Sequence, residues 1–180
     1  MGNNDSKKEA ELEALRYFIP IYKEVTDDFL EVIEDSERPD FICKRSDGAL
    51  VGVELARVRR GHPNDVLYDV IVNKNIKMVP DQAIDLIQTL IENKEEKRKA
   101  NDWKLSEKTI LIIQLQESPL RELASVLTVD TFPDLPGFGF FEIWLADFSE
   151  KDAYNNIELF CLFPLHMRGY FRRHLQKPYG

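Results

Sequence analysis

The sequence predicts one α/β domain, and three features of the chain indicate it. Residues 41–58 contain two short strand-like runs joined by a turn, and residues 81–100 carry apolar side chains at helical spacing. Residues 109–116 form a continuous apolar strand. Strands that alternate with amphipathic helices are typical of a sheet covered by helices. We assign residues 7–180 to this single domain and expect residues 1–6 to be a disordered N-terminus.

The N-terminal part is predicted to be helical in two stretches. From about Lys7, apolar side chains recur at helical spacing at Leu12, Leu15, Phe18 and Ile19. Pro20 interrupts this pattern, and residues 21–34 are predicted to form a second helix. Glu11 precedes Leu15 by four residues, so it is the acid of the first helix that lies closest to the apolar face. A glutamate that faces solvent is the alternative.

Residues 41–58 are predicted to be a β-hairpin. The Ser-Asp-Gly run at residues 46–48 is a turn signal, and residues 50–58 are rich in aliphatic and β-branched side chains. Side chains alternate along a strand, which places Val51, Val53 and Leu55 on one face and Glu54 on the other. Glu54 therefore stands opposite the aliphatic face.

Asp40 and Glu54 are a candidate metal site. A carboxylate between two aliphatic residues costs free energy to bury unless a cation meets it. Asp40 follows Pro39 at the start of the partner strand, where it can supply a second oxygen ligand to the same ion. Mg²⁺ is typically held by one or two carboxylates together with substrate phosphate. The alternative is an ordinary two-sided hairpin with Glu54 exposed to solvent.

The helix at residues 81–100 gives the clearest pattern in the chain. Its apolar stripe consists of Ala83, Ile84, Leu86, Ile87, Leu90 and Ile91. Lys94 continues the middle of this stripe, seven residues after Ile87 and four after Leu90. We expect its ammonium to point toward the carboxylates of the hairpin, and a lysine that extends past the last apolar turn into solvent is the alternative.

The other segments complete the α/β pattern. Residues 66–78 fit either a helix or a cover over the site. The C-terminal half is predicted to contain a short helix at 119–127, a loop at 129–139 and antiparallel strands at 140–148 and 157–163. The tail that follows mixes aromatic residues with Arg and His, and we expect it to cap the fold, with contact to nucleic acid as the alternative.

Charge and cysteine content restrict the partners and the compartment. The net charge of −8 argues against broad, non-specific binding to nucleic acid, which needs a basic surface. It does not exclude a nuclease, since carboxylate and metal sites are acidic, and a homodimer or a partner subunit would supply basic surface. Cys43 and Cys161 fall in predicted strands, so we expect reduced core thiols of a cytoplasmic protein. No apolar run approaches the ~20 residues of a membrane span, and we expect no membrane partner.

The order of these features resembles the PD-(D/E)xK nuclease superfamily, which has the restriction-endonuclease-like fold. Pro39, Asp40 and Glu54 carry the likeness, in a centre that reads "PD…G…GVE" as in small bacterial members, and it covers about residues 7–116. The resemblance implies a three-layer core with a mixed central sheet flanked by helices. It also implies metal-dependent hydrolysis of phosphodiester bonds, with Mg²⁺ or Mn²⁺ held by Asp40, Glu54 and the Leu55 carbonyl and with Glu11 as an outer ligand.

The chain departs from this family at two places. The usual lysine lies two residues after the Glu, where this chain has Ala56, but some members carry the lysine on the following helix, as Lys94 would here. No strand is predicted between the first helix and Pro39, although the family core has one. We expect a nuclease that acts on nucleic acid, with DNA favoured over RNA. The alternatives are a catalytically inactive relative that serves as a binding or assembly module, and an unrelated α/β domain.

Overall fold

A computed structural model describes residues 2–58, 78–150 and 156–171 of the chain. In chain order its helices and strands are α1 (Gly2–Thr26), β1 (Glu31–Asp35), β2 (Phe41–Lys44), β3 (Leu50–Arg57), α3 (Pro80–Ala100), β4 (Thr109–Leu115), α4 (Leu120–Leu123), β5 (Glu142–Asp147), β6 (Glu158–Phe163) and β7 (Gly169–Phe171). The helix or cover expected at residues 66–78 lies outside the described residues, apart from its last position.

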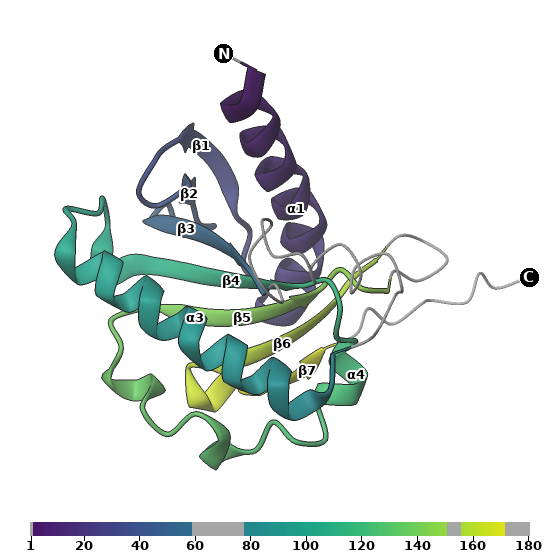
Figure 1. Cartoon of the computed structure of the whole chain (residues 1–180). Helices are drawn as coiled ribbons and strands as arrows, with labels where there is room; N and C mark the ends of the chain where they lie inside the picture. The colour runs from purple at the N-terminus through teal and green to yellow at the C-terminus, as the bar shows by residue number, and fades with distance from the viewer. Residues whose placement is uncertain (1, 59–77, 151–155, 172–180) are drawn as a thin grey trace, which may run out of the picture.

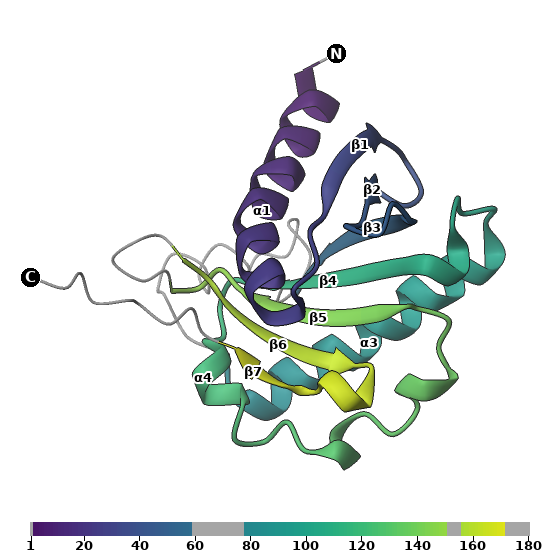
Figure 2. The ribbon, with the colours of Figure 1, turned by 180° about the vertical axis from the view of Figure 1, so that it is seen from behind.

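The strands form one mixed sheet of seven, in the order β1 to β7 (Figure 1). Strands β1, β2 and β3 are antiparallel neighbours, and β3, β4 and β5 are parallel. Strand β6 is antiparallel to β5, and β7 is antiparallel to β6. Helix α3 lies across one face of the sheet and α1 across the other, as the opposite view shows (Figure 2). The prediction of an α/β domain with a mixed sheet flanked by helices is confirmed.

The sheet separates two hydrophobic clusters. One lies under α3 and includes Ile87, Ile91, Leu111, Ile113 and Leu145. The other lies under α1 and includes Phe18, Tyr22, Val53, Ile112 and Trp144. Strand β4 is buried along its whole length because it is central in the sheet and covered on both faces. Both cysteines are buried with free thiols, as the sequence predicted.

Three predictions for the N-terminal region are wrong. Helix α1 begins at Gly2 instead of near Lys7, it continues through Pro20, and residues 31–35 form strand β1 instead of the end of a second helix. Pro20 faces solvent, while buried apolar residues before and after it hold the helix against the sheet. Strand β1 lies at the edge of the sheet and most of its side chains are exposed, so its sequence shows no apolar alternation.

The β2–β3 hairpin forms where the sequence predicted it. Gly48 adopts a φ of 83° in the turn, a left-handed conformation that glycine reaches without steric cost. Asp47 Oδ1 accepts a hydrogen bond from the Ala49 N–H at 2.9 Å, which also stabilises the turn. The faces of β3 are also as predicted, since Val53 and Leu55 pack under α1 and Ala56 packs under α3.

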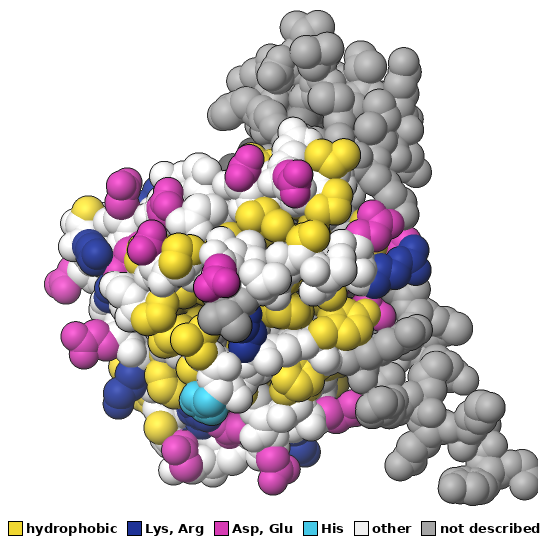
Figure 3. Space-filling model, turned by 90° about the horizontal axis from the view of Figure 1, so that it is seen from below, with side chains coloured by type: hydrophobic (Ala, Val, Ile, Leu, Met, Phe, Trp, Pro, Cys, Tyr) yellow, Lys and Arg dark blue, Asp and Glu magenta, His cyan; other side chains and the backbone are white. Residues whose placement is uncertain are grey.

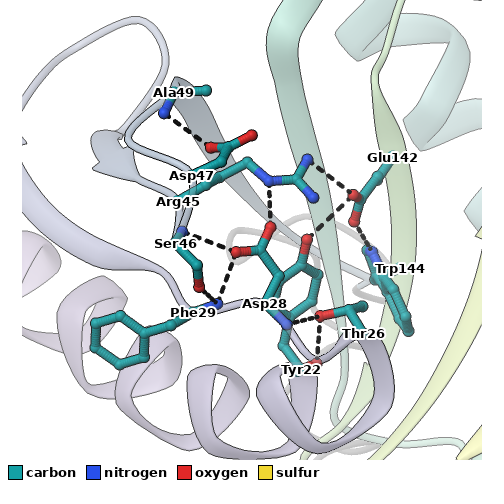
Figure 4. Close-up of polar contacts among 10 residues, drawn as sticks. All are labelled: Tyr22, Thr26, Asp28, Phe29, Arg45, Ser46, Asp47, Ala49, Glu142 and Trp144. Carbon is teal, nitrogen blue, oxygen red and sulfur yellow. Dashed lines mark hydrogen bonds and ion pairs between the residues drawn. The ribbon is translucent and has the colours of Figure 1, made fainter.

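A buried polar network fixes the C-terminal end of α1 to the hairpin and to β5 (Figure 4). Glu142 accepts hydrogen bonds from the Tyr22 hydroxyl at 3.1 Å and from Trp144 Nε1 at 2.7 Å. The Arg45 guanidinium lies 3.8 Å from the same carboxylate and also pairs with Asp28. Burial raises the pKa of Glu142. The network therefore connects three elements that are far apart in the sequence.

The surface carries its exposed apolar side chains on several different elements. Among the described residues, the large ones are Phe29, Ile33, Leu50, Val79, Val126, Phe141, Leu165 and Tyr170. Figure 3 shows the face seen from below, on which hydrophobic side chains lie among acidic and basic ones. Within the described ranges, no helix combines the length and the apolar character needed to cross a membrane.

Candidate active site

The candidate carboxylates lie where β2 and β3 separate. The pairing of these strands ends at Phe41 and Val53, and Asp40 and Glu54 are the next residues on each side. Asp40 Oδ2 accepts a hydrogen bond from the Leu55 N–H at 2.8 Å, and Glu54 Oε2 accepts one from the Asp40 N–H at 3.2 Å. Each carboxylate is thus held by the backbone of the opposite strand.

The Leu55 carbonyl oxygen lies on the same side of β3 as the two carboxylates. In an extended strand the N–H and C=O of one residue point to the same side. Because the Leu55 N–H points to Asp40, the Leu55 carbonyl also points away from β4 and toward this edge of β3. Leu55, Asp40 and Glu54 line one cavity. Two carboxylates and one carbonyl oxygen, all of which can bind a metal ion, are therefore directed to the same cavity.

This cavity has a volume of about 890 Å³ and takes its walls from both faces of the sheet. Glu11 comes from α1, Glu54 and Ala56 come from β3, and Lys94 comes from α3. The cavity thus collects every side chain that the sequence singled out for the site. These residues span positions 11 to 94 of the chain.

Lys94 reaches the carboxylates from α3. Its Nζ donates a hydrogen bond to Glu54 Oε1, and the side chains of Lys94 and Glu54 are 22% and 7% exposed. Ile87 and Ile91 are fully buried, so the stripe that ends at Lys94 is docked on the sheet. The two alternatives, a solvent-exposed Glu54 and a Lys94 that extends into solvent, are therefore wrong.

Asp40 is a buried carboxylate that lies close to Glu54 and Glu11. Burial, followed by the nearby Glu54 and Glu11 charges, raises its pKa from 3.8 to about 6, although the Leu55 N–H and Lys94 act in the opposite direction. Burial, the largest cause, leaves the Asp40 carboxylate poorly solvated, and a bound cation would stabilise its charged form.

Glu11 is buried at the α1 side of the cavity, so the alternative of a solvent-facing glutamate is wrong. Its carboxylate lies 3.3 Å from Lys7 Nζ and 3.7 Å from Lys8 Nζ, and Glu11 raises the pKa of Lys7. Lys8 also donates hydrogen bonds to the carbonyl oxygens of Ser36, at 2.7 Å, and Asp40, at 2.6 Å. Lys8 thus fixes the backbone of Asp40, a role that no motif or periodicity in the sequence indicated.

The donor set fits a hard cation. In the described part of the chain, no group of three or more His, Cys, Asp or Glu side chains is placed to hold a metal ion. Mg²⁺ does not need such a group, because it keeps several waters and binds one or two carboxylates plus substrate phosphate. Carboxylate and carbonyl oxygens suit Mg²⁺ and Mn²⁺ better than softer metals. Asp40, Glu54 and the Leu55 carbonyl are therefore a suitable set for such an ion.

Asp40→Asn is expected to stabilise the metal-free protein at pH 8. Because the folded chain binds the Asp40 proton with a pKa of about 6, above the 3.8 of an ordinary Asp, folding weakens as the pH rises through about 6. The amide keeps an acceptor for the Leu55 N–H and removes the charge. We expect a rise of roughly 3–6 °C in Tm at pH 8 and about half of that at pH 5, where the unfolded state has already lost the proton that the folded state still keeps, by thermal unfolding in EDTA.

Asp47→Asn is the matched control, because Asp47 lies exposed in the β2–β3 turn. This variant should keep the wild-type difference in Tm between pH 5 and pH 8. If Asp40→Asn also keeps that difference, Asp40 is not the group that titrates near pH 6.

The structure brings the predicted residues together in two groups. Asp40, Glu54 and Lys94 contact one another directly or through the hairpin backbone, whereas Glu11 lines the same cavity and pairs with lysines of its own helix. Compared with protein-family models, with curated proteins and with solved structures, the chain gave no match.

Proposed function

We propose that the protein is a metal-dependent nuclease that hydrolyses phosphodiester bonds of nucleic acid, DNA rather than RNA. The observation that carries the proposal is the contact between Lys94 and Glu54 in the cavity that also holds Asp40. Two carboxylates and one ammonium at a single cavity are the groups that metal-assisted phosphoryl hydrolysis requires.

The element order supports membership of the PD-(D/E)xK superfamily and its restriction-endonuclease-like fold. Helix α1 carries the inward Glu11, β2 follows directly on Pro39 and Asp40, β3 carries Glu54, and α3 and the buried β4 come next. The family core has a strand between the first helix and the Pro-Asp strand, and β1 occupies that place. One of the two departures noted in the sequence is thereby removed.

Asp40 and Glu54, with the Leu55 carbonyl, would hold the metal ion. Mg²⁺ or Mn²⁺ bound there supplies Lewis-acid polarisation of the scissile phosphate and lowers the pKa of the attacking water. Lys94 has three N–H donors and uses one on Glu54, which leaves donors for a phosphate oxygen or the water. Its charge offsets the negative charge that develops on the phosphate during attack. This is the role that the family gives to the lysine absent at Ala56.

We also propose that the protein acts in the cytoplasm. Cys43 and Cys161 are buried with free thiols, as is usual where the thiol pool is reducing. Burial raises the pKa of both thiols to about 12, which keeps them protonated and unreactive.

Removal of the metal tests the proposal. The purified protein should cleave plasmid DNA or a single-stranded oligonucleotide in the presence of Mg²⁺ or Mn²⁺, and EDTA should stop cleavage until excess metal is restored. The measurement is product formation on a gel. The contrary result would be a protein that is inactive on DNA and RNA with either metal and is recovered with a partner at stoichiometric amounts. That result would favour the alternative, a catalytically inactive binding or assembly module, which is also consistent with the alanine at position 56.

A further inference from the structure

We infer that the protein holds its substrate strand on one side of the carboxylates, in a subsite between β3 and α3 that binds a backbone phosphate next to the scissile one. This inference rests on the proposed nuclease function. It adds a binding site to that function, with Arg57 and Lys97 as phosphate-binding residues.

The subsite is a cavity of about 300 Å³ that adjoins the catalytic one. Arg57, Leu90, Lys94 and Lys97 line both cavities, so a chain of atoms that leaves the carboxylates on this side enters the subsite directly. A volume of this size lies at the lower end of small-ligand pockets. It suits one nucleotide unit of a longer strand.

The charges of the subsite suit a phosphate. Its lining contains the three cations Arg57, Lys94 and Lys97 and no Asp or Glu among the described residues. This concentration of positive charge stands out in a chain whose net charge is −8. A polyanion is attracted to such a patch even when the whole protein is acidic.

The opposite side of the catalytic cavity has the reverse character. A second cavity of about 890 Å³ continues there, and its lining carries the six acids Glu11, Glu34, Asp35, Glu37, Asp40 and Asp102 against the four cations Lys7, Lys8, Arg38 and Lys104. Lys7 and Lys8 are both paired with Glu11. Lys104 lies in the same wall, but its Nζ is 2.7 Å from Glu34 Oε1 and its charge is thereby compensated. A phosphate backbone is disfavoured along this wall. The substrate strand is therefore held asymmetrically about the bond that is cut.

Arg57 is positioned for this role by its neighbour strand. Its Nε donates a hydrogen bond to Oε1 of the buried Gln114 at 3.3 Å, and the two residues are paired across β3 and β4. The Gln114 contact orients the guanidinium before any ligand arrives, which reduces the entropy lost on binding.

Lys97 is one turn beyond Lys94 and is exposed, and it forms no ion pair with a described acid. Val58, Leu86 and Leu90 form an apolar wall in the same cavity. The cations then face the phosphate while this wall accommodates a sugar or a base. These contacts do not distinguish one base from another, so the subsite predicts affinity for the strand without sequence preference.

The test measures strand binding apart from cleavage. Glu54→Gln is used as the background, so that the strand is not cut, and the probe is a short fluorescein-labelled oligothymidylate in Mg²⁺ buffer, followed by fluorescence anisotropy over a range of salt. Added Lys97→Gln should weaken binding by about five- to tenfold and lower the slope of log K against log salt by about 0.7, the value for one phosphate contact of a single strand.

Lys104→Gln in the same background is the matched control, because it removes one exposed lysine from the acidic side of the carboxylates. It should leave both the affinity and the salt slope unchanged, and Arg57→Gln should act in the same direction as Lys97→Gln. Equal effects of Lys97→Gln and Lys104→Gln, or no effect of either, would overturn the subsite. If wild-type protein fails to cleave but Lys97→Gln still lowers affinity and slope selectively, the nuclease proposal fails and the subsite stands.

Discussion

Glu54→Gln is expected to lower the rate of Mg²⁺-dependent cleavage by about 10³-fold or more while the protein stays folded. Glutamine keeps an oxygen that can accept from the Asp40 N–H, so the hairpin contact at this position survives. It removes the negative charge that the metal and Lys94 need. Lys94 loses its ionic partner, but its side chain is 22% exposed, so water solvates the ammonium and the fold is retained.

The measurement is single-turnover cleavage of a labelled strand at saturating Mg²⁺, with thermal unfolding of the same samples as a check on folding. Glu96→Gln is the matched control, because Glu96 is an exposed glutamate of α3 that lines none of the three cavities described above. It should cleave at the wild-type rate. A Glu54→Gln protein that also retains this rate would show that the activity comes from another site or from a contaminating enzyme.

Lys94→Ala is expected to reduce cleavage by about 10²- to 10³-fold without weakening Mg²⁺ binding. The ammonium stabilises charge on the phosphate, but it also occupies Glu54 Oε1, where it competes with the metal. Removal of Lys94 should therefore tighten Mg²⁺ binding, measured by calorimetry, while the cleavage rate falls. Loss of both metal affinity and activity would mean that Lys94 serves only to hold Glu54 in place.

Ala56 offers a direct test of the amine's role. It lies on the same face of β3 as Glu54, two residues further on, and lines the same cavity although its side chain is only 7% exposed. In the double variant Lys94→Ala/Ala56→Lys, the ammonium would come from the strand instead of the helix. We expect this variant to regain at least about tenfold in rate over Lys94→Ala alone. A folded double variant with no gain in rate would contradict an electrostatic role for the amine at this cavity.

Part of the fold was predictable because its signals are local. The β2–β3 hairpin follows from a turn sequence between two apolar runs, and α3 follows from a long regular stripe. Strand β1 was not predictable in the same way, because an edge strand with exposed side chains has no periodicity to detect. It is recognised as a strand through its pairing with β2, a contact that depends on the folded sheet.

The candidate site was predictable to a similar extent. Asp40 and Glu54 could be placed on neighbouring strands, and helical geometry pointed Lys94 inward, so the expected proximity of Lys94 and Glu54 is found. The catalytic roles of these residues stay predictions. The sequence did not indicate Lys8 or Gln114 as supporting residues, because each acts on a neighbour that is distant in the chain.

The docking of α3 on the sheet has a consequence for variation elsewhere in the protein. Ala83, Ile87 and Ile91 are fully buried, and Lys94 lies one turn beyond the last of them. The packing of the hydrophobic cluster under α3 therefore sets the distance between the Lys94 ammonium and Glu54. An error of about 1 Å in such a distance is enough to lower a rate by roughly 10²-fold. In the proposed nuclease, substitutions that only loosen the packing at Ile91 are therefore expected to reduce catalysis before they unfold the protein, although Ile91 itself would not contact the substrate.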